Sequence, residues 1–303
     1  EQDDLPLWQF DRIYIYPEEN TELLNLLIVS NDGSEQLTAT IEKAGAYQII
    51  NRYDRNHAQL QKYLEVPFGA KLIYIPETVE NMTKKTFVAN TIDPDLFTNV
   101  LFSNPSLVKP NQREAFFTDG QRGMRVYQDG RYLEFINPID TSNNKLLQAD
   151  DLFDRSLNHI NDHKGWFNQY HLDSLRVTLG EINFRLHYEG FPVFDYNDLS
   201  VITQVWREQE LYQYHRSLLY SGHLLNVMDI QLPNGHQIIE TIQQAEDYNL
   251  NQITDIQVGY LLNYMDEARS ITLEPIWLMR YENSWLRVPV TNNEINSEGI
   301  RGD

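Results

Sequence analysis

The sequence predicts an α+β fold in which antiparallel sheets are each covered by helices. The main observation is that a helix followed by antiparallel strands occurs twice in the C-terminal two-thirds of the chain. The second is an aromatic content of 12%, because flat rings pack well across pleated strands. Since an antiparallel sheet needs one face covered, we expect the helix of each unit to cover its own sheet.

The first unit begins with a predicted helix that stops before Gly165. Its apolar residues recur at the spacing of one helical face, and they are Ala149, Leu152, Phe153, Leu157 and Ile160. Alternation of apolar and polar residues then predicts a strand over 182–188. Further strands over 201–206 and 211–214 complete a predicted meander.

The second unit repeats this order after a connecting strand near 224–232. Pro233-Asn234-Gly235 opens its predicted helix, and strands are expected over 256–264, 271–281 and 285–290. The repeat is one of architecture, because the two copies do not align residue by residue.

The first hundred residues have a mixed pattern. Strands are predicted over 10–16, 23–29, 37–41, 71–75 and 86–92, and helices over 55–64 and 94–102. Prolines and asparagines between residues 104 and 111 indicate a boundary, and Asp129-Gly130 indicates a hairpin. We therefore expect three α+β domains: a truncated N-terminal domain over 1–110, a central domain over 111–220 and a C-terminal domain over 221–303.

The charge balance argues against several classes of partner. The 303 residues carry 44 carboxylates against 24 Lys and Arg, a net charge of −20, which repels nucleic acid and anionic lipid. The absence of cysteine excludes disulfides, Cys–Zn sites and thiol catalysis. No run approaches the roughly 18 apolar residues that span a bilayer. Because the chain begins at Glu1, we expect it to be a piece of a longer protein whose signal peptide or anchor lies outside it.

Histidines are the main candidates for chemistry. His159 and His163 stand four residues apart, so they either share a zinc ion or form the solvated end of a helix. Seven of the eight histidines lie between residues 159 and 236, which is compatible with a pH sensor or with ordinary polar strand faces. No nucleophile elbow or phosphate-binding loop is present. The sequence therefore predicts no catalytic, cofactor-binding or metal-binding residue, and no enzyme.

Aromatic side chains are the other conspicuous group. Each unit places them on its last strands, and they include Trp206, Tyr212, Tyr214, Trp277, Tyr281 and Trp285. Such rings form either the core between sheet and helix or a face that binds a peptide or a sugar. The sequence leaves both interpretations open.

Short strand and turn motifs follow one another in a distinctive order from about residue 8 to about residue 290. They are Phe10-Asp11-Arg12-Ile13-Tyr14-Ile15, Leu101-Phe102-Ser103-Asn104-Pro105, Phe117-Thr118-Asp119-Gly120-Gln121-Arg122-Gly123-Met124, Asn137-Pro138, Glu189-Gly190-Phe191-Pro192-Val193-Phe194, Val205-Trp206, Leu211-Tyr212-Gln213-Tyr214-His215-Arg216-Ser217-Leu218 and Leu273-Glu274-Pro275-Ile276-Trp277. In order and spacing they resemble the YycH family, whose members are membrane-anchored, extracytoplasmic regulators of the sensor kinase WalK in low-GC Gram-positive bacteria. The sister family YycI is the main confusable relative.

This resemblance implies a regulatory protein without catalysis or cofactors. It implies binding to a YycI-like partner and, through it or directly, modulation of a WalK-like sensor histidine kinase that controls cell-wall metabolism. It also implies a location at the outer face of the cell membrane, with an N-terminal anchor helix that this chain lacks. As a hypothesis, a partner surface is bordered by Phe191, Phe194, Trp206, Tyr212 and Tyr214.

The alternative function is an extracytoplasmic sensor module that binds a peptide or a cell-wall glycan. A concave pocket lined by aromatic side chains would favour the sensor, and a flat apolar patch would favour the partner-binding regulator.

Overall fold

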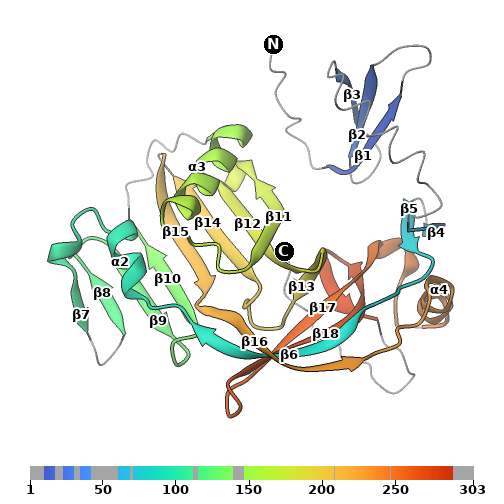
Figure 1. The fold of residues 1–303 in the computed structure, drawn as a ribbon. Coiled ribbons are helices and arrows are strands. Elements are labelled where there is room, and N and C mark those ends of the chain that lie inside the picture. Colours follow the sequence, from blue (N-terminus) through green and yellow to red (C-terminus); the bar gives the residue numbers. More distant parts are fainter. Residues whose placement is uncertain are drawn as a thin grey trace.

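The computed structural model describes residues 10–17, 23–30, 35–41, 61–68, 71–111, 115–138, 147–207, 209–245 and 247–288 (Figure 1). Strands dominate these residues, and they form one large and two small sheets. Within this part of the chain, no helix is both long enough and apolar enough to cross a membrane.

The two small sheets belong to the N-terminal third of the chain. The first has the order β1-β2-β3, with bounds β1 (Phe10–Pro17), β2 (Leu24–Ser30) and β3 (Gln36–Ile41), as the sequence predicts. The second pairs β4 (Tyr63–Phe68) with β5 (Lys71–Pro76).

The helix predicted over 55–64 is wrong at its C-terminal end. Residues 55–60 lie outside the described residues, and Tyr63 and Leu64 belong to β4. Val66 and Phe68 are buried from this strand, and they pack in one core with Ile73 and Ile75 of β5. Pairing between the two strands therefore prevails over the local helical pattern.

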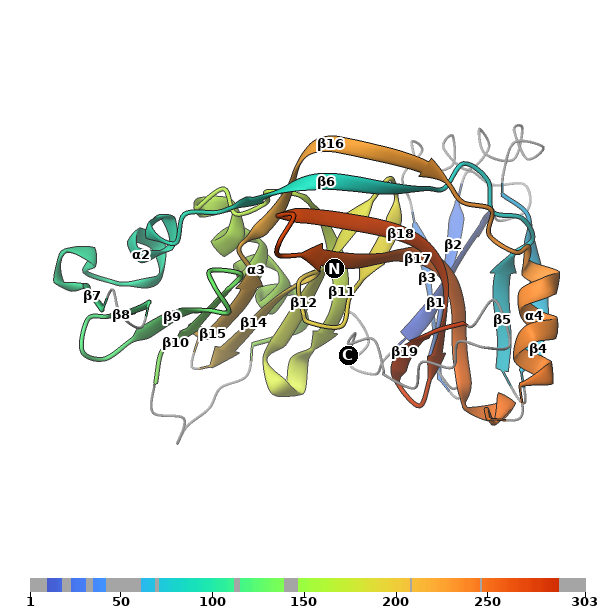
Figure 2. The same cartoon turned by 90° about the horizontal axis from the view of Figure 1, so that it is seen from below.

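All other strands of the described residues form a single 14-stranded sheet. Neighbours in the order β16-β6-β18-β17-β13-β12-β14-β15-β10-β9-β8-β7 are hydrogen-bonded, while β11 pairs with β12 and β19 with β18. The bounds are β6 (Thr83–Thr91), β7 (Lys109–Asn111), β8 (Phe116–Thr118), β9 (Gly123–Tyr127), β10 (Tyr132–Ile136), β11 (Gln169–Arg176), β12 (Glu181–Tyr188), β13 (Phe191–Phe194), β14 (Val201–Arg207), β15 (Glu210–Ser217), β16 (Leu219–Asp229), β17 (Ile253–Met265), β18 (Ser270–Tyr281) and β19 (Ser284–Arg287). Figure 2 shows β16, β6 and β18 running side by side along the molecule.

The α-helices of the described residues are α2 (Asp95–Leu101), α3 (Ala149–Asp162) and α4 (Gly235–Gln244). Short 3-10 turns are η2 (Pro105–Leu107), η3 (Val177–Leu179) and η4 (Leu250–Gln252). These bounds agree with the predicted helices that start at Pro94, at Ala149 and after Pro233. The α+β class holds, although the described chain is mostly strand and a helix on every sheet is not confirmed.

Two local features position α3 and α4: the buried face of α3 and the capped N-terminus of α4. Leu152, Ser156 and Ile160 line the buried face of α3, which lies over the sheet at β12 and β14 (Figure 1). The N-terminus of α4 is a capping box, in which Asn234 accepts from the Gln237 amide at 3.0 Å and the Gln237 side chain accepts from the Asn234 amide at 2.9 Å.

The strand β13, which the sequence does not predict, joins the two units. Glu189 and Gly190 have φ values of 51° and 86°, the left-handed region required by a two-residue turn between β12 and β13. Val193 then pairs with Tyr260 in parallel to β17, whereas every other strand pair of the described sheet is antiparallel. A Cβ at Gly259 would lie 2.6 Å from the Pro192 carbonyl oxygen, so only glycine permits this close approach.

Sheet pairing crosses the predicted domain boundaries. β6 belongs to the predicted first domain, yet it pairs with β16 and β18 of the predicted third domain. The division at residues 110 and 220 stays a prediction.

Candidate functional site

A cleft opens between the β11–β12 hairpin and the long strands β6, β16 and β18. Its volume is about 340 Å³. The lining residues come from five strands and two connections, and they are Phe87, Asn168, Gln169, Leu186, His187, Tyr188, Glu189, Ser221, Gly222 and Leu273. The cleft therefore lies where the two helix-and-strand units meet, beside the turn that leads into β13.

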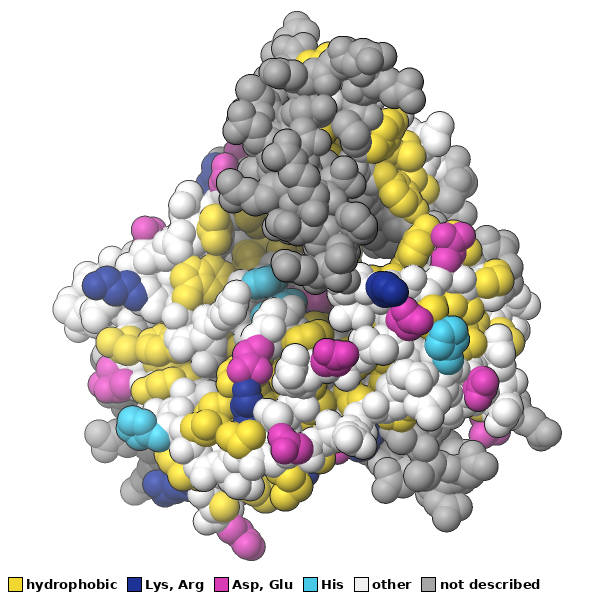
Figure 3. All heavy atoms as spheres, turned by 45° about the vertical axis from the view of Figure 1, so that its right-hand side comes forward, with side chains coloured by type: hydrophobic (Ala, Val, Ile, Leu, Met, Phe, Trp, Pro, Cys, Tyr) yellow, Lys and Arg dark blue, Asp and Glu magenta, His cyan; other side chains and the backbone are white. Residues whose placement is uncertain are grey.

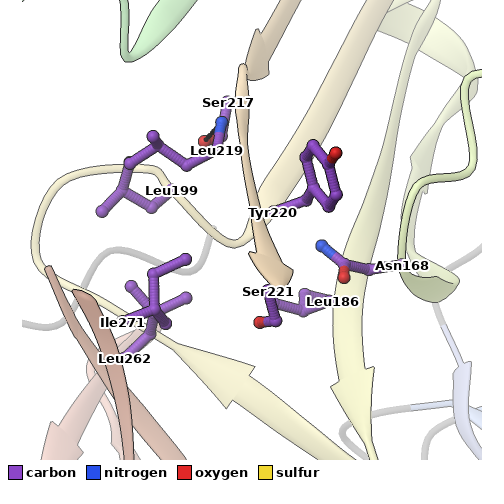
Figure 4. Close-up of a pocket in the computed structure, with 9 residues that line it drawn as sticks. All are labelled: Asn168, Leu186, Leu199, Ser217, Leu219, Tyr220, Ser221, Leu262 and Ile271. Atoms are coloured by element: carbon purple, nitrogen blue, oxygen red, sulfur yellow. Dashed lines mark hydrogen bonds between the residues drawn. The ribbon is translucent and has the colours of Figure 1, made fainter. Parts of the chain in front are cut away.

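A much smaller cavity of about 10 Å³ adjoins the cleft (Figure 4). Asn168, Leu186 and Ser221 line both spaces. Figure 4 shows Leu199, Leu219, Leu262 and Ile271 on one side of the small cavity, with Tyr220, Asn168 and Ser221 on the other. Its volume suits about one water molecule, so this cavity admits no larger group.

The rim of the cleft carries an ion pair. The Lys85 ammonium donates to a Glu189 carboxylate oxygen and, at 3.3 Å, to the Tyr188 hydroxyl, and it lies 4.8 Å from the centre of the Tyr188 ring. Partial burial alone would lower the pKa of Lys85, but the bonds to Glu189 and Tyr188 outweigh it and the pKa is raised. These contacts fix the Tyr188 ring, whose edge contact with Phe87 has a centroid distance of 5.6 Å.

One wall of the cleft holds a stacked pair of histidines. The rings of His171 and His187 lie with centroids 3.9 Å apart and planes 15° from parallel. Burial is the main cause that lowers the pKa of His187, and the nearby His171 and Arg185 add to it, although its bond to the Arg185 carbonyl opposes the shift. At neutral pH His187 therefore presents an uncharged imidazole to the cleft.

Next to these histidines in β12, a buried arginine holds three strands together. Arg185 is 1% exposed and donates to both oxygens of Asp173, from Nε at 2.8 Å and from Nη2 at 2.9 Å. Its Nη1 donates to the Val193 carbonyl at 3.3 Å, and its guanidinium lies 4.3 Å from the centre of the Phe194 ring. This two-pronged geometry fixes β11, β12 and β13 relative to one another.

Chemically, the cleft suits a ligand held by hydrogen bonds and ring contacts. Asn168, Gln169, His187 and Ser221 offer amide, imidazole and hydroxyl groups beside aromatic rings, a combination that fits peptides and sugars. In the part of the chain that the structure describes, no three His, Asp or Glu side chains gather as metal ligands do.

His159 and His163 are half-buried and pack against aromatic rings, so the prediction of a solvated helix end is wrong. Their ring centroids lie 5.3 Å apart, and both rings contact Tyr214, at 5.7 Å and 6.0 Å. Burial lowers the pKa of each imidazole to about 4; for His163, the neighbouring His159 and Arg216 lower it further. The end of α3 folds onto the aromatic residues of β14 and β15, and helical spacing alone does not reveal this contact.

The five residues predicted to border a partner surface do not lie together. Tyr214, Phe194 and Trp206 are 0%, 1% and 9% exposed, so they belong to the core. Tyr214 and Trp206 pack beneath α3, while Phe194 packs against Trp285 at a centroid distance of 5.3 Å. Phe191 and Tyr212 are partly exposed, and the Tyr212 ring lies 4.6 Å from the guanidinium of Arg207.

Sequence reasoning missed the cleft because its walls are far apart in the chain. Phe87 meets Tyr188 only after β6 has paired with β16 and β18. The one available signal was Glu189-Gly190, which opens one of the family-like motifs and forms the turn at the rim.

Known proteins similar to this chain were found by sequence and by structure. The two-component system WalR/WalK regulatory protein YycH of Bacillus subtilis (strain 168) is 23% identical over 305 residues, which cover 96% of this chain and 66% of the relative. The chain thus spans just under two thirds of that protein. The crystal structure of YycH from Bacillus subtilis superposes with a TM-score of 0.70 at 21% identity, over 94% of this chain and 72% of the other, and shows the shared fold. A family model described as YycH protein, C-terminal domain, matches residues 70–295. Because that match covers well over half of the sequence, the chain belongs to the YycH family.

Proposed function

We propose that this protein is a non-enzymatic regulator in a two-component system. It binds a YycI-like partner and modulates a WalK-like sensor histidine kinase that controls cell-wall metabolism, at the outer face of a Gram-positive cell membrane to which its parent protein is anchored. The observation that carries the proposal is the family match over residues 70–295, since the similar Bacillus subtilis protein is named as a regulatory protein of WalR/WalK.

The surface of the protein offers places for such a partner. Figure 3 shows one face, on which hydrophobic side chains lie in several patches among scattered carboxylates. Of the five residues predicted to border a partner surface, Phe191 and Tyr212 have exposed area for a contact. Partly exposed aromatic rings of this kind are frequent anchors in protein interfaces.

We expect Phe191→Ala and Tyr212→Ala each to weaken binding to the soluble domain of a YycI-like partner about tenfold, because they remove aromatic contact area. Affinity is measured by calorimetry with the purified chain, and Tyr63→Ala serves as the control because Tyr63 is 57% exposed on a separate sheet. Unchanged affinity in both variants would place the partner surface elsewhere. Failure of the wild-type chain to bind at micromolar concentration would leave the membrane anchor as the main contact.

The cleft supports a second candidate function, a sensor that binds a peptide or a cell-wall glycan. Its volume of about 340 Å³ lies in the range of small-ligand sites, and its walls combine rings with hydrogen-bonding groups.

For the sensor, peptidoglycan fragments are expected to bind the wild-type chain and to lose at least tenfold in affinity with Tyr188→Ala, because the ring forms part of the wall. Titration followed by tryptophan fluorescence or calorimetry measures this. Tyr264→Ala, a ring outside the cleft, is the matched control. If neither glycan nor stem-peptide fragments bind, the cleft is not a ligand site.

A further inference from the structure

β16 forms the outer edge of the large sheet. It pairs with β6 on one side, and it has no second strand partner in the described residues. Figure 2 shows it as the outermost of the long strands. From His223 to Asp229 seven consecutive residues are exposed, so both faces of this half of the strand and its free backbone edge are open to solvent.

The exposed half of β16 is strongly apolar. Leu224, Leu225, Val227 and Met228 are exposed by 52%, 58%, 48% and 53%. An edge strand with open N–H and C=O groups and large apolar side chains is a template for pairing with another strand. Monomeric proteins usually protect such an edge with charges, prolines or bulges, and here, beside the bulges at Leu224, four large apolar side chains occupy it.

The sequence of this edge identifies the strand that fits it. The segment reads His223-Leu224-Leu225-Asn226-Val227-Met228-Asp229 and is self-complementary about its central residue. We propose that β16 pairs in antiparallel orientation with β16 of a second copy of this chain, with the two-fold axis at Asn226.

In that register every residue meets a suitable partner. Leu224 faces Met228 and Leu225 faces Val227, so each apolar side chain gains an apolar neighbour. His223 faces the Asp229 carboxylate, and the two Asn226 amides, each both donor and acceptor, face one another. Because the interface is two-fold symmetric, each mixed pair occurs twice. A parallel pairing in register would instead place histidine on histidine and aspartate on aspartate.

The backbone of β16 is bulged in the first half of the pairing stretch and regular in the second. Two register shifts against β6 lie on either side of Leu224, and such bulges increase the twist of an edge. From Asn226 to Asp229 the strand pairs regularly with β6. Continued beyond the exposed segment, the same register brings Ile230 and Gln231 of the second copy beside Gly222 and Ser221, which line the cleft. The dimer would therefore extend the sheet and narrow the mouth of the cleft.

Single-cysteine variants test this register directly, because the chain has no cysteine of its own. Asn226→Cys is expected to form a covalent dimer on mild oxidation, since directly opposed residues in antiparallel strands fall within disulfide range. Leu224→Cys alone is expected not to cross-link, because its counterpart lies about 13 Å away along the strand. An equimolar mixture of Leu224→Cys and Met228→Cys is expected to cross-link. Equal cross-linking of all single variants, or none for Asn226→Cys, overturns the proposal.

Sedimentation velocity tests whether the dimer forms without a covalent bond. The wild-type chain is expected to dimerise by about 100 μM. The Leu225→Lys variant is expected to have a dissociation constant at least tenfold higher. The reason is that the Leu225–Val227 contact occurs twice in the symmetric dimer, and the substitution places a charge in both copies. Leu172→Lys on β11 is the matched control, since Leu172 is 48% exposed on a different edge. A wild-type chain that stays monomeric, or two lysine variants that behave alike, overturns the proposal. Circular dichroism confirms that both variants remain folded.

Discussion

Replacing Asp173 with alanine is expected to lower the free energy of unfolding by about 3–5 kcal/mol. The substitution leaves the Arg185 guanidinium, 1% exposed, without the carboxylate that accepts both of its short hydrogen bonds. A buried charge that loses its partner retains its full cost of desolvation. The loss is expected to reach beyond the hairpin, because Arg185 also bonds to the carbonyl of Val193 in β13.

Equilibrium urea unfolding measures the effect, and two further variants make its cause testable. Asp173→Ala combined with Arg185→Met is expected to recover much of the stability, because replacing both charges by apolar groups is often close to neutral. Arg176→Ala removes the partner of Glu181 in the same hairpin, but that pair is 3.7 Å long and both side chains are more than 20% exposed. Its expected cost is below about 1 kcal/mol. A double variant as unstable as Asp173→Ala would contradict the role of the unpaired arginine.

Acidification is expected to destabilise the protein between pH 6.5 and pH 4 through His159 and His163. The pKa of each is about 4 in the folded state, below the value near 6.5 of an unfolded chain. The unfolded state therefore binds more protons in this window, and stability falls as the pH falls. Shifts of this size correspond to roughly 3 kcal/mol per histidine once the pH is below both values. In addition, His159 Nε2 is buried without a hydrogen-bond partner among the described residues, so a proton there would add an unsatisfied donor.

The measurement is the unfolding free energy at a series of pH values for the wild type and for His159→Gln combined with His163→Gln. The double variant is expected to lose less stability between pH 6.5 and pH 4, even if it is weaker at pH 7 because the glutamines pack less well. His236→Gln, at an exposed position of α4, is the matched control and is expected to follow the wild type. Parallel curves for the wild type and the double variant would contradict the assignment.

Local pattern sufficed for much of the secondary structure. The helical spacing from Ala149 to Ile160 and the cap at Asn234 belong to single segments, and both helices form where expected. β13 was missed because its pattern is only four residues long and includes a proline, Pro192, which is rare inside strands. Its pairing with β17 depends on Gly259, whose missing side chain lets the two backbones come close. The same limit applies to Tyr63 and Leu64, whose strand depends on its partner β5.

The sites depend on contacts that residue type does not reveal. An aromatic residue such as Tyr214 suits a core and an interface equally well, and only the packing of α3 decides that it is buried. The cleft needs Phe87 and Tyr188 together, which no local pattern indicates. The turn at Glu189 and Gly190 and the strand after it, which form one of the family-like motifs, hold the two units together.

The position of β6 in the sheet has a consequence for how the chain folds during synthesis. Val88 of β6 pairs with Ser270 of β18, which a ribosome adding about 5–20 residues per second reaches roughly 10–40 s later. Although β16 is made earlier, β6 lacks β18 until then, and Phe87, 6% exposed in the finished protein, is not yet paired with Ile271. Such high contact order makes folding slow. The large sheet closes late, when its C-terminal strands arrive, and a chain that stops before β18 also leaves β6 without that partner.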